Sequence, residues 1–392
     1  MIVDALLLLL PLAAVSGWYA AKRNSHDLLI TPPKENTHFT RDYLAGLNYL
    51  LNEQPDKAID VFIKMLEIDS ETVETHLALG ALFRRRGEVE RAIRIHQNVI
   101  ARPQLPGYQR IEALLALGKD YLRAGLFDRA ERVFLEVSDG NKSQIMIAKR
   151  HLLDIYQQQK QWDQAIAIAN TLEDANQEIA VRVAHYHCEL VEAAIASGQL
   201  APARALLKQA LNAHPKCVRA SLLQGDIEAK AGDFKTSLQA YQRVREQDPD
   251  YLNEVVAPLA TAHVQLEDKD GLLAYLQDSL QIFPRTSLTL TLMESIQYRE
   301  GDAAAIDFMT GQLHQRPSLR GLQSLIALQI KAAAGQAGEN LLILKELIDR
   351  LLKNKSVYRC GQCGYAGKVL HWLCPGCKTW ETTKPILGVE GE

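Results

Sequence analysis

The chain has 392 residues, of which 44 are basic and 47 acidic, so its formal net charge is −3. This balance excludes the strong positive field expected of a nucleic-acid-binding protein, and no nucleic acid is expected as a partner. The length exceeds what one hydrophobic core usually organises, and aromatic residues make up only 6%. Such a composition favours stacked helices over sheets, so we expect an extended helical array.

The N-terminal segment, residues 1–21, has the length and composition of a membrane anchor. The run from Ala5 to Ala21 carries no charge, and a helix needs about 20 mainly apolar residues to cross a bilayer. Lys22 and Arg23 follow the span instead of preceding it, which argues against a cleaved signal peptide and for a cytoplasmic remainder. Residues 22–38 are expected to form a linker. A buried helix packed on the repeats is the alternative for the span.

A 34-residue repeat follows the linker. Gly46 and Ala58 are followed 34 residues later by Gly80 and Ala92, as in tetratricopeptide repeats, where two helices cross at a small residue. The register continues with Gly118 and Ala130, Tyr156 and Ala165, Ala203 and Pro215, Gly225, Tyr241 and Pro249, Leu272 and Pro284, and Ala305 and Pro317.

The repeats predict an all-α fold, a tetratricopeptide-repeat superhelical solenoid with about eight repeats over residues 39–318. Residues 319–355 are expected to form terminal capping helices. Spacing drifts at Pro103–Pro106 and at Gln177–Arg182, where we expect insertions between repeats.

Stacked helix pairs present a concave surface that such proteins use for binding. Groove-facing positions on the first helices of repeats two to four are occupied by Arg84, Lys119, Arg123 and Arg150. This basic strip could seat acidic side chains or a carboxylate of a partner through charge-assisted hydrogen bonds. A solvated charged face is the alternative, and a single sequence favours it because exposed helix faces are commonly charged.

Histidine and cysteine residues cluster in the first helix of repeat five, at His185, His187 and Cys188. His187 and Cys188 are adjacent in sequence, whereas side chains converge on a helix when they lie three or four residues apart. We therefore interpret the cluster as packing. Cys217 is likewise interpreted as a buried thiol.

Residues 356–392 contain four of the six cysteines, Cys360, Cys363, Cys374 and Cys377, spaced C-x2-C-x10-C-x2-C. Two residues between thiolates let both sulfurs reach one ion at about 2.3 Å in tetrahedral geometry. We predict one tetrahedral metal ion per chain, with zinc favoured and iron as the alternative. A closed shell of four thiolates leaves no position for a substrate, so no catalytic residues are expected. A disulfide pair and a redox-active dithiol are the alternatives to metal.

This segment is too small for a core of its own, so the ion should supply much of its folding free energy. Tyr358, Trp372 and Trp380 are expected to pack against the ribbon or the neighbouring helices.

Short motifs along the whole chain carry a resemblance to a known family. They are Gly17-Trp18-Tyr19, Arg41-Asp42-Tyr43, the stretches 86–89 and 91–97, and the segments 358–364 and 372–386. With the order of the parts, they resemble the lipopolysaccharide assembly protein B family of Gram-negative bacteria. The metal knuckles also resemble those of rubredoxin, although a shorter segment separates them, which argues against electron transfer.

The resemblance implies a non-enzymatic adaptor of the inner membrane that regulates lipopolysaccharide synthesis. Such an adaptor brings the deacetylase of the committed step of lipid A synthesis to a membrane-bound AAA protease for proteolysis. Other lipopolysaccharide assembly or regulatory membrane proteins are further implied partners. Two alternatives remain: a scaffold for lipopolysaccharide biosynthesis and transport enzymes, and a rubredoxin-like electron carrier.

Overall fold

The computed structural model describes residues 73–172, 176–332, 336–389 and 391, with isolated positions between 44 and 61. The predicted anchor and linker, residues 1–38, and most of the first repeat lie outside the described residues. Among the residues that are described, no helix is both long and apolar enough to cross a bilayer. The chain divides into two compact units, Met1–Ala148 and Lys149–Glu392, and each is described by itself.

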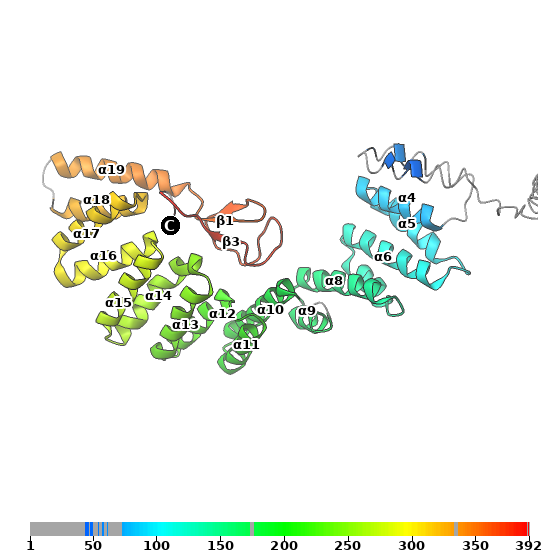
Figure 1. Ribbon diagram of the computed structural model, residues 1–392, viewed down its shortest axis with the longest axis horizontal. Helices are drawn as coiled ribbons and strands as arrows, with labels where there is room; N and C mark the ends of the chain where they lie inside the picture. Colours follow the sequence, from blue (N-terminus) through cyan, green and yellow to red (C-terminus); the bar gives the residue numbers. More distant parts are fainter. Residues whose placement is uncertain are drawn as a thin grey trace, which may run out of the picture. The chain divides into compact units, whose positions relative to one another are not determined.

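The first unit is built from successive helix pairs (Figure 1). Its helices are α4 (Val73–Arg86), α5 (Val89–Ile100), α6 (Gly107–Arg123) and α7 (Phe127–Leu135), followed by the start of α8 (Lys142–Gln158). The proline-rich segment 103–106 lies between α5 and α6, where the sequence predicts an insertion.

The second unit continues the helix pairs and ends in a small sheet (Figure 1). Its elements after α8 are α9 (Trp162–Ala169), α10 (Gln177–Ala196), α11 (Leu200–Ala213), α12 (Val218–Lys230), α13 (Phe234–Gln247), η1 (Pro249–Tyr251), α14 (Leu252–Gln265), α15 (Lys269–Ile282), α16 (Thr286–Glu300), α17 (Asp302–Gln315), α18 (Leu319–Ala332), α19 (Gln336–Lys353), β1 (Tyr358–Cys360), β2 (Ala366–Gly367) and β3 (Thr383–Pro385).

One expectation about spacing is wrong. Gln177–Arg182 is not an insertion between repeats but the first turns of α10, a helix of 20 residues. Asn176 caps this helix, because its side chain accepts a hydrogen bond from the backbone N–H of Ile179 at 3.1 Å. The extra residues therefore lengthen a first helix and leave the pairing of helices intact.

In several repeats a glycine of the first helix meets a ring of the second helix. A Cβ atom at Gly118 would lie 2.6 Å from the ring of Phe134, and one at Gly225 would lie 2.2 Å from Tyr241. Any side chain there would push the helices apart, so the glycines fix the crossing distance. The small residues that the repeat pattern assigns to the second helices, Ala92, Ala130, Ala165, Ala203 and Ala305, are completely buried. The pattern therefore located the helix crossings correctly.

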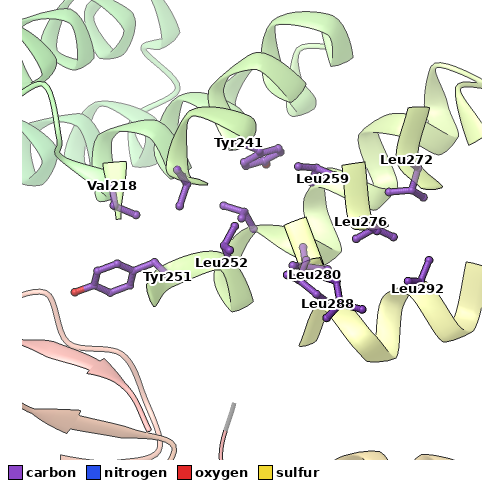
Figure 2. Close-up of a cluster of buried hydrophobic side chains, with 13 residues drawn as sticks. Val218, Tyr241, Tyr251, Leu252, Leu259, Leu272, Leu276, Leu280, Leu288 and Leu292 are labelled. Carbon is purple, nitrogen blue, oxygen red and sulfur yellow. The ribbon is translucent and has the colours of Figure 1, made fainter. Parts of the chain in front are cut away.

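The core of the second unit runs through α13, α14, α15 and α16 (Figure 2). Leu252 and Leu259 of α14 pack with Leu276 of α15 and Leu288 of α16, and all four are completely buried. Tyr251 lies at the edge of this cluster, and Figure 2 shows its hydroxyl directed toward the strands of the C-terminal sheet. The same core therefore stabilises the repeats and supports the C-terminal segment.

The C-terminal segment is a three-stranded antiparallel sheet in the order β2-β1-β3. Tyr358 pairs with Gly367 of β2 and with Pro385 of β3, and a further bridge joins Leu373 to Trp380. This sheet and its loops, residues 356–389, are called the ribbon below.

Candidate metal centre and its seat on the repeats

The four predicted cysteines converge at one end of the ribbon. Their sulfur atoms all lie within 4.8 Å of one another. The Sγ atoms of Cys360 and Cys377 are 3.7 Å apart, and those of Cys363 and Cys374 are 3.6 Å apart. Sulfurs at the corners of a tetrahedron with metal bonds of about 2.3 Å lie about 3.8 Å apart. The donor set and the two shortest sulfur–sulfur distances therefore fit one zinc-sized ion.

Local hydrogen bonds favour a thiolate at this site. Burial raises the pKa of Cys360, but its hydrogen-bond contact with the Thr382 side chain and the backbone N–H of Cys363 outweigh burial and lower the pKa to about 6. The pKa of Cys363 is raised to about 11: the backbone N–H of Tyr365 acts to lower it, and burial and the neighbouring cysteine side chains outweigh that effect. The pKa of Cys377 is also lowered, first by a hydrogen bond with the Thr379 side chain. Thiolates gathered this closely repel one another, so a bound cation would stabilise them.

A tryptophan just after the second knuckle joins the ribbon to the repeats. Trp380 is 5% exposed, and its Nε1 donates a hydrogen bond of 3.0 Å to Gln157 of α8. Its ring stacks on His185 of α10 at a centroid distance of 4.6 Å and meets Tyr186 edge-on at 6.1 Å. The guanidinium of Arg219, on α12, lies 6.0 Å from the same ring. One side chain thus contacts the first helices of three successive repeats.

Polar contacts extend this seat to η1 and α14. Lys384 of β3 forms ion pairs of 2.9 and 2.8 Å with Asp248 and Asp250. The hydroxyl of Tyr251 donates to the backbone oxygen of Thr383 at 3.0 Å, and that of Tyr358 donates to Glu254 at 2.5 Å. The ribbon is therefore bound across first helices of the second unit.

The aromatic residues expected to pack at the ribbon do so. Trp372 lies 5.3 Å from Tyr251 and 5.9 Å from His185, measured between ring centroids. With Trp380 and Tyr358, it forms the contact surface between ribbon and repeats. Two partners on the ribbon could not be identified from the sequence: Lys384, and Glu381, whose Oε1 accepts a hydrogen bond from His185.

The predicted basic strip begins with an arginine that already has a partner. Arg84 of α4 forms an ion pair of 2.7 Å with Asp120 of α6 and also donates to the backbone oxygen of Ala116. The other carboxylate oxygen of Asp120 contacts Nδ1 of His96, and Asp120 and His96 are completely buried. Arg84 therefore joins two repeats of the first unit, and its charge is largely neutralised there.

The other three residues of the strip have different surroundings. Lys119 of α6 is partly buried, and both burial and the charge of Arg84 lower its pKa. Arg123 and Arg150 are exposed on α6 and α8. The exposed charges are thus the members of the strip that a partner can reach.

Comparison with known proteins follows the same division of the chain. The tetratricopeptide repeat family matches residues 75–106, 115–178 and 188–251, and a rubredoxin metal binding domain matches residues 358–385. Lipopolysaccharide assembly protein B of Escherichia coli (strain K12) is 37% identical over 390 residues, which is 99% of each chain. The protein of that name from Haemophilus influenzae is 35% identical, again over 99% of each chain.

Among solved structures, the C-terminal part of a repeat protein from Cytophaga hutchinsonii has a TM-score of 0.43 at 14% identity. It covers 64% of this chain and 99% of that chain.

Helix pairs closed by glycine–aromatic contacts and a docked four-cysteine ribbon define a class: a tetratricopeptide-repeat solenoid with a rubredoxin-like zinc-ribbon domain. Identity above 30% over nearly the full length narrows this class further. The chain belongs to the lipopolysaccharide assembly protein B family.

Proposed function

We propose that the chain is a membrane-tethered cytoplasmic adaptor in the regulation of lipopolysaccharide synthesis, with no active site of its own. It holds the deacetylase of the committed step of lipid A synthesis close to a membrane-bound AAA protease of the inner membrane, and so promotes proteolysis of the deacetylase. Membership of the lipopolysaccharide assembly protein B family supports the pathway, and the repeat fold supports a binding role.

The observation that carries the proposal is the docking of the ribbon on the repeats. A metal ion held by four thiolates has no open position, and here the ribbon is bound by Trp380 and Lys384 across several repeats. When bound, the ion supplies cross-linking of the two knuckles. The residues around it provide docking, so the metal domain stabilises a binding scaffold.

The seat also limits where a client can bind. In the second unit the ribbon covers parts of α10, α12 and η1, which belong to the helix faces that repeat proteins use for partners. Arg123 of α6 is exposed, as is Arg150 of α8, a helix that the ribbon contacts at Gln157. We expect the client to contact these helices.

The test is the half-life of the deacetylase after protein synthesis is stopped. Cells that lack this chain should retain the deacetylase for several times longer than cells that contain it, and re-expression should restore the short half-life. An unchanged half-life would reject the adaptor and favour the scaffold for lipopolysaccharide assembly enzymes.

The properties of the bound metal distinguish an electron carrier from both the adaptor and the scaffold. It requires iron that is reduced and reoxidised reversibly at a physiological potential. Elemental analysis followed by electrochemistry of the purified protein should find a metal that does not cycle in this way.

A further inference from the structure

A second group of metal-ligating side chains lies where the ribbon meets the repeats of the second unit. The Nε2 atom of His185, the Sγ atom of Cys217 and a carboxylate oxygen of Glu381 all lie within 4.8 Å of one another. His185 is on α10, Cys217 immediately precedes α12, and Glu381 belongs to the ribbon. His214, which follows α11, adds a second imidazole, with its Nε2 3.7 Å from Oε2 of Glu381.

The distances within this group are those of a compact coordination shell. Ligand atoms bound tetrahedrally at about 2.0 to 2.3 Å lie about 3.3 to 3.8 Å from one another. Nε2 of His185 and Oε1 of Glu381 are 3.0 Å apart, and Nε2 of His214 lies 3.7 Å from Oε2, the other oxygen of the same carboxylate. The ligand atoms of His185, Cys217 and Glu381 lie within 4.8 Å of one another, and His214, beside the same carboxylate, would complete the shell once its side chain rotates toward them.

Hydrogen bonding alone explains only part of the arrangement. It accounts for the contact between His185 and Glu381, but 3.7 Å from His214 to Glu381 is too long for a hydrogen bond. His185 and Cys217 are completely buried, and His214 is 8% exposed. Glu381 also has a φ of 56°, a left-handed conformation that costs energy in a residue with a side chain. That strain is retained at the position that places a carboxylate between two imidazoles.

The charges also balance around a divalent cation. One thiolate and one carboxylate carry two negative charges, and the two neutral imidazoles add none, so a bound divalent ion would be neutralised in this buried place. The nearby guanidinium of Arg219 is paired with Glu189 at 2.8 Å and with Glu192 at 2.7 Å. It therefore leaves no uncompensated positive charge beside the group.

We propose that His185, His214, Cys217 and Glu381 form a second metal site, of the zinc class, that joins the ribbon to the repeats. Two imidazoles, one thiolate and one carboxylate are borderline-soft ligands that suit zinc better than magnesium or calcium. Binding forms four metal–ligand bonds, and the thiol proton of Cys217 leaves to solvent. This proposal is independent of the adaptor function, because it concerns only how the two domains are held together.

The experiment counts metal ions in the full chain, purified in detergent, saturated with zinc and freed of excess by gel filtration. The expected stoichiometry is two zinc ions per chain, decreasing to one in Cys217→Ser and in Glu381→Gln. His187→Gln is the control, because His187 is buried on the same helix but is not part of the group. It should retain two. One ion per chain in the unmodified protein would overturn the proposal.

Cobalt substitution shows which ion is lost. The ribbon site has four sulfur ligands and the second site one, so sulfur-to-cobalt charge-transfer absorption arises mostly from the ribbon. Cys217→Ser should lose one equivalent of cobalt and keep most of this absorption. Loss of most of it would show that Cys217 acts through the fold of the ribbon, which would also overturn the proposal.

Discussion

Single residues at helix ends carry strain that a substitution can relieve. Several first helices end before a glycine with positive φ, such as Gly125 after α6 at 75°. Lys160 after α8 and Glu267 after α14 occupy the same place with a φ of 57° each. Both are exposed, and the next residue but one in each turn begins the second helix. These two turns therefore have the left-handed backbone that glycine adopts after α6, but with a residue that carries a side chain.

Glu267→Gly should consequently stabilise the protein. Holding a residue with a side chain in the left-handed conformation costs the folded state about 1 to 2 kcal/mol. Glycine avoids that cost, but its greater conformational freedom stabilises the unfolded chain by about 0.5 to 1 kcal/mol. We expect a net gain of about 0.5 to 1 kcal/mol, measured as a higher midpoint of urea unfolding. Gly125→Ala is the matched control and should lower the midpoint. A lower midpoint for Glu267→Gly would show that its side chain contributes more than the strain costs.

Sequence spacing predicted the role of individual residues only where that role depends on local backbone geometry. The four cysteines were found because two residues between thiolates is a local geometric requirement. Arg84 pairs with Asp120, 36 residues away on the next repeat, a partner that the spacing does not identify. That pairing depends on how two repeats stack, which the spacing does not specify. His185 and Cys217 were interpreted from the sequence as packing residues, and their proximity to Glu381 of the ribbon likewise depends on how distant elements meet.

The ribbon illustrates how an element too small for its own core acquires stability. Its strands have two or three residues each, and two of its docking side chains, Trp380 and Lys384, follow the last cysteine, Cys377. Loss of the ion should therefore loosen both the knuckles and the seat. Cys374→Ser should release the ribbon metal and increase amide hydrogen exchange over residues 356–389 by at least tenfold. Val369→Ser, at a side chain that is 64% exposed in the ribbon, should change neither. Unchanged exchange in Cys374→Ser would mean that docking alone holds the ribbon.

Docking of the ribbon should also depend on pH through Asp250. Burial acts to raise the pKa of Asp250, but the hydrogen bond and charge of Lys384 and the charge of Arg285 outweigh it, so the pKa is lowered. A folded pKa below the unfolded value of about 3.9 gives stability that is complete above that value and is lost as pH falls through the folded pKa. The pair is 42% and 32% exposed, so its contribution should stay below about 1 kcal/mol.

Lys384→Met is the variant that tests this dependence. In the parent protein, urea unfolding of the ribbon followed by tryptophan fluorescence should lose stability below about pH 4. The variant should start lower at neutral pH and lose less on acidification. Equal acid sensitivity in the two proteins would assign the effect to other carboxylates. Lys368→Met, which removes an exposed ribbon lysine that donates to the backbone oxygen of Lys353, is the control.

At the scale of the whole molecule, the sequence predicted the parts and their order but not their contact. Repeats are recognisable because a local crossing recurs along the chain, as with Gly118 against Phe134 and Gly225 against Tyr241. The seat of the ribbon is different, since Thr383 meets Tyr251 across 132 residues. Nothing periodic marks such a contact, and it follows only from the three-dimensional path of the helices. The sequence therefore predicts the groove and the ribbon as separate surfaces. In the second unit the ribbon instead covers part of the first-helix faces that would line such a groove.

The proposed adaptor activity needs both a membrane tether and a binding surface, so it is a property of the whole chain. A tethered client meets a membrane-bound protease at an effective concentration of about millimolar, so modest contacts can suffice. Deleting residues 1–21 should leave a folded protein that binds the deacetylase but no longer shortens its half-life.

Reversing the charges of Lys119, Arg123 and Arg150 tests the binding surface separately. Arg84 is left intact because it pairs with Asp120. If the strip binds the client, the triple variant should lose client binding in pull-down assays while it remains in the membrane. If the strip is only solvated surface, binding and half-life should both be unchanged. A deletion variant that still promotes turnover at matched abundance would show that the tether is dispensable.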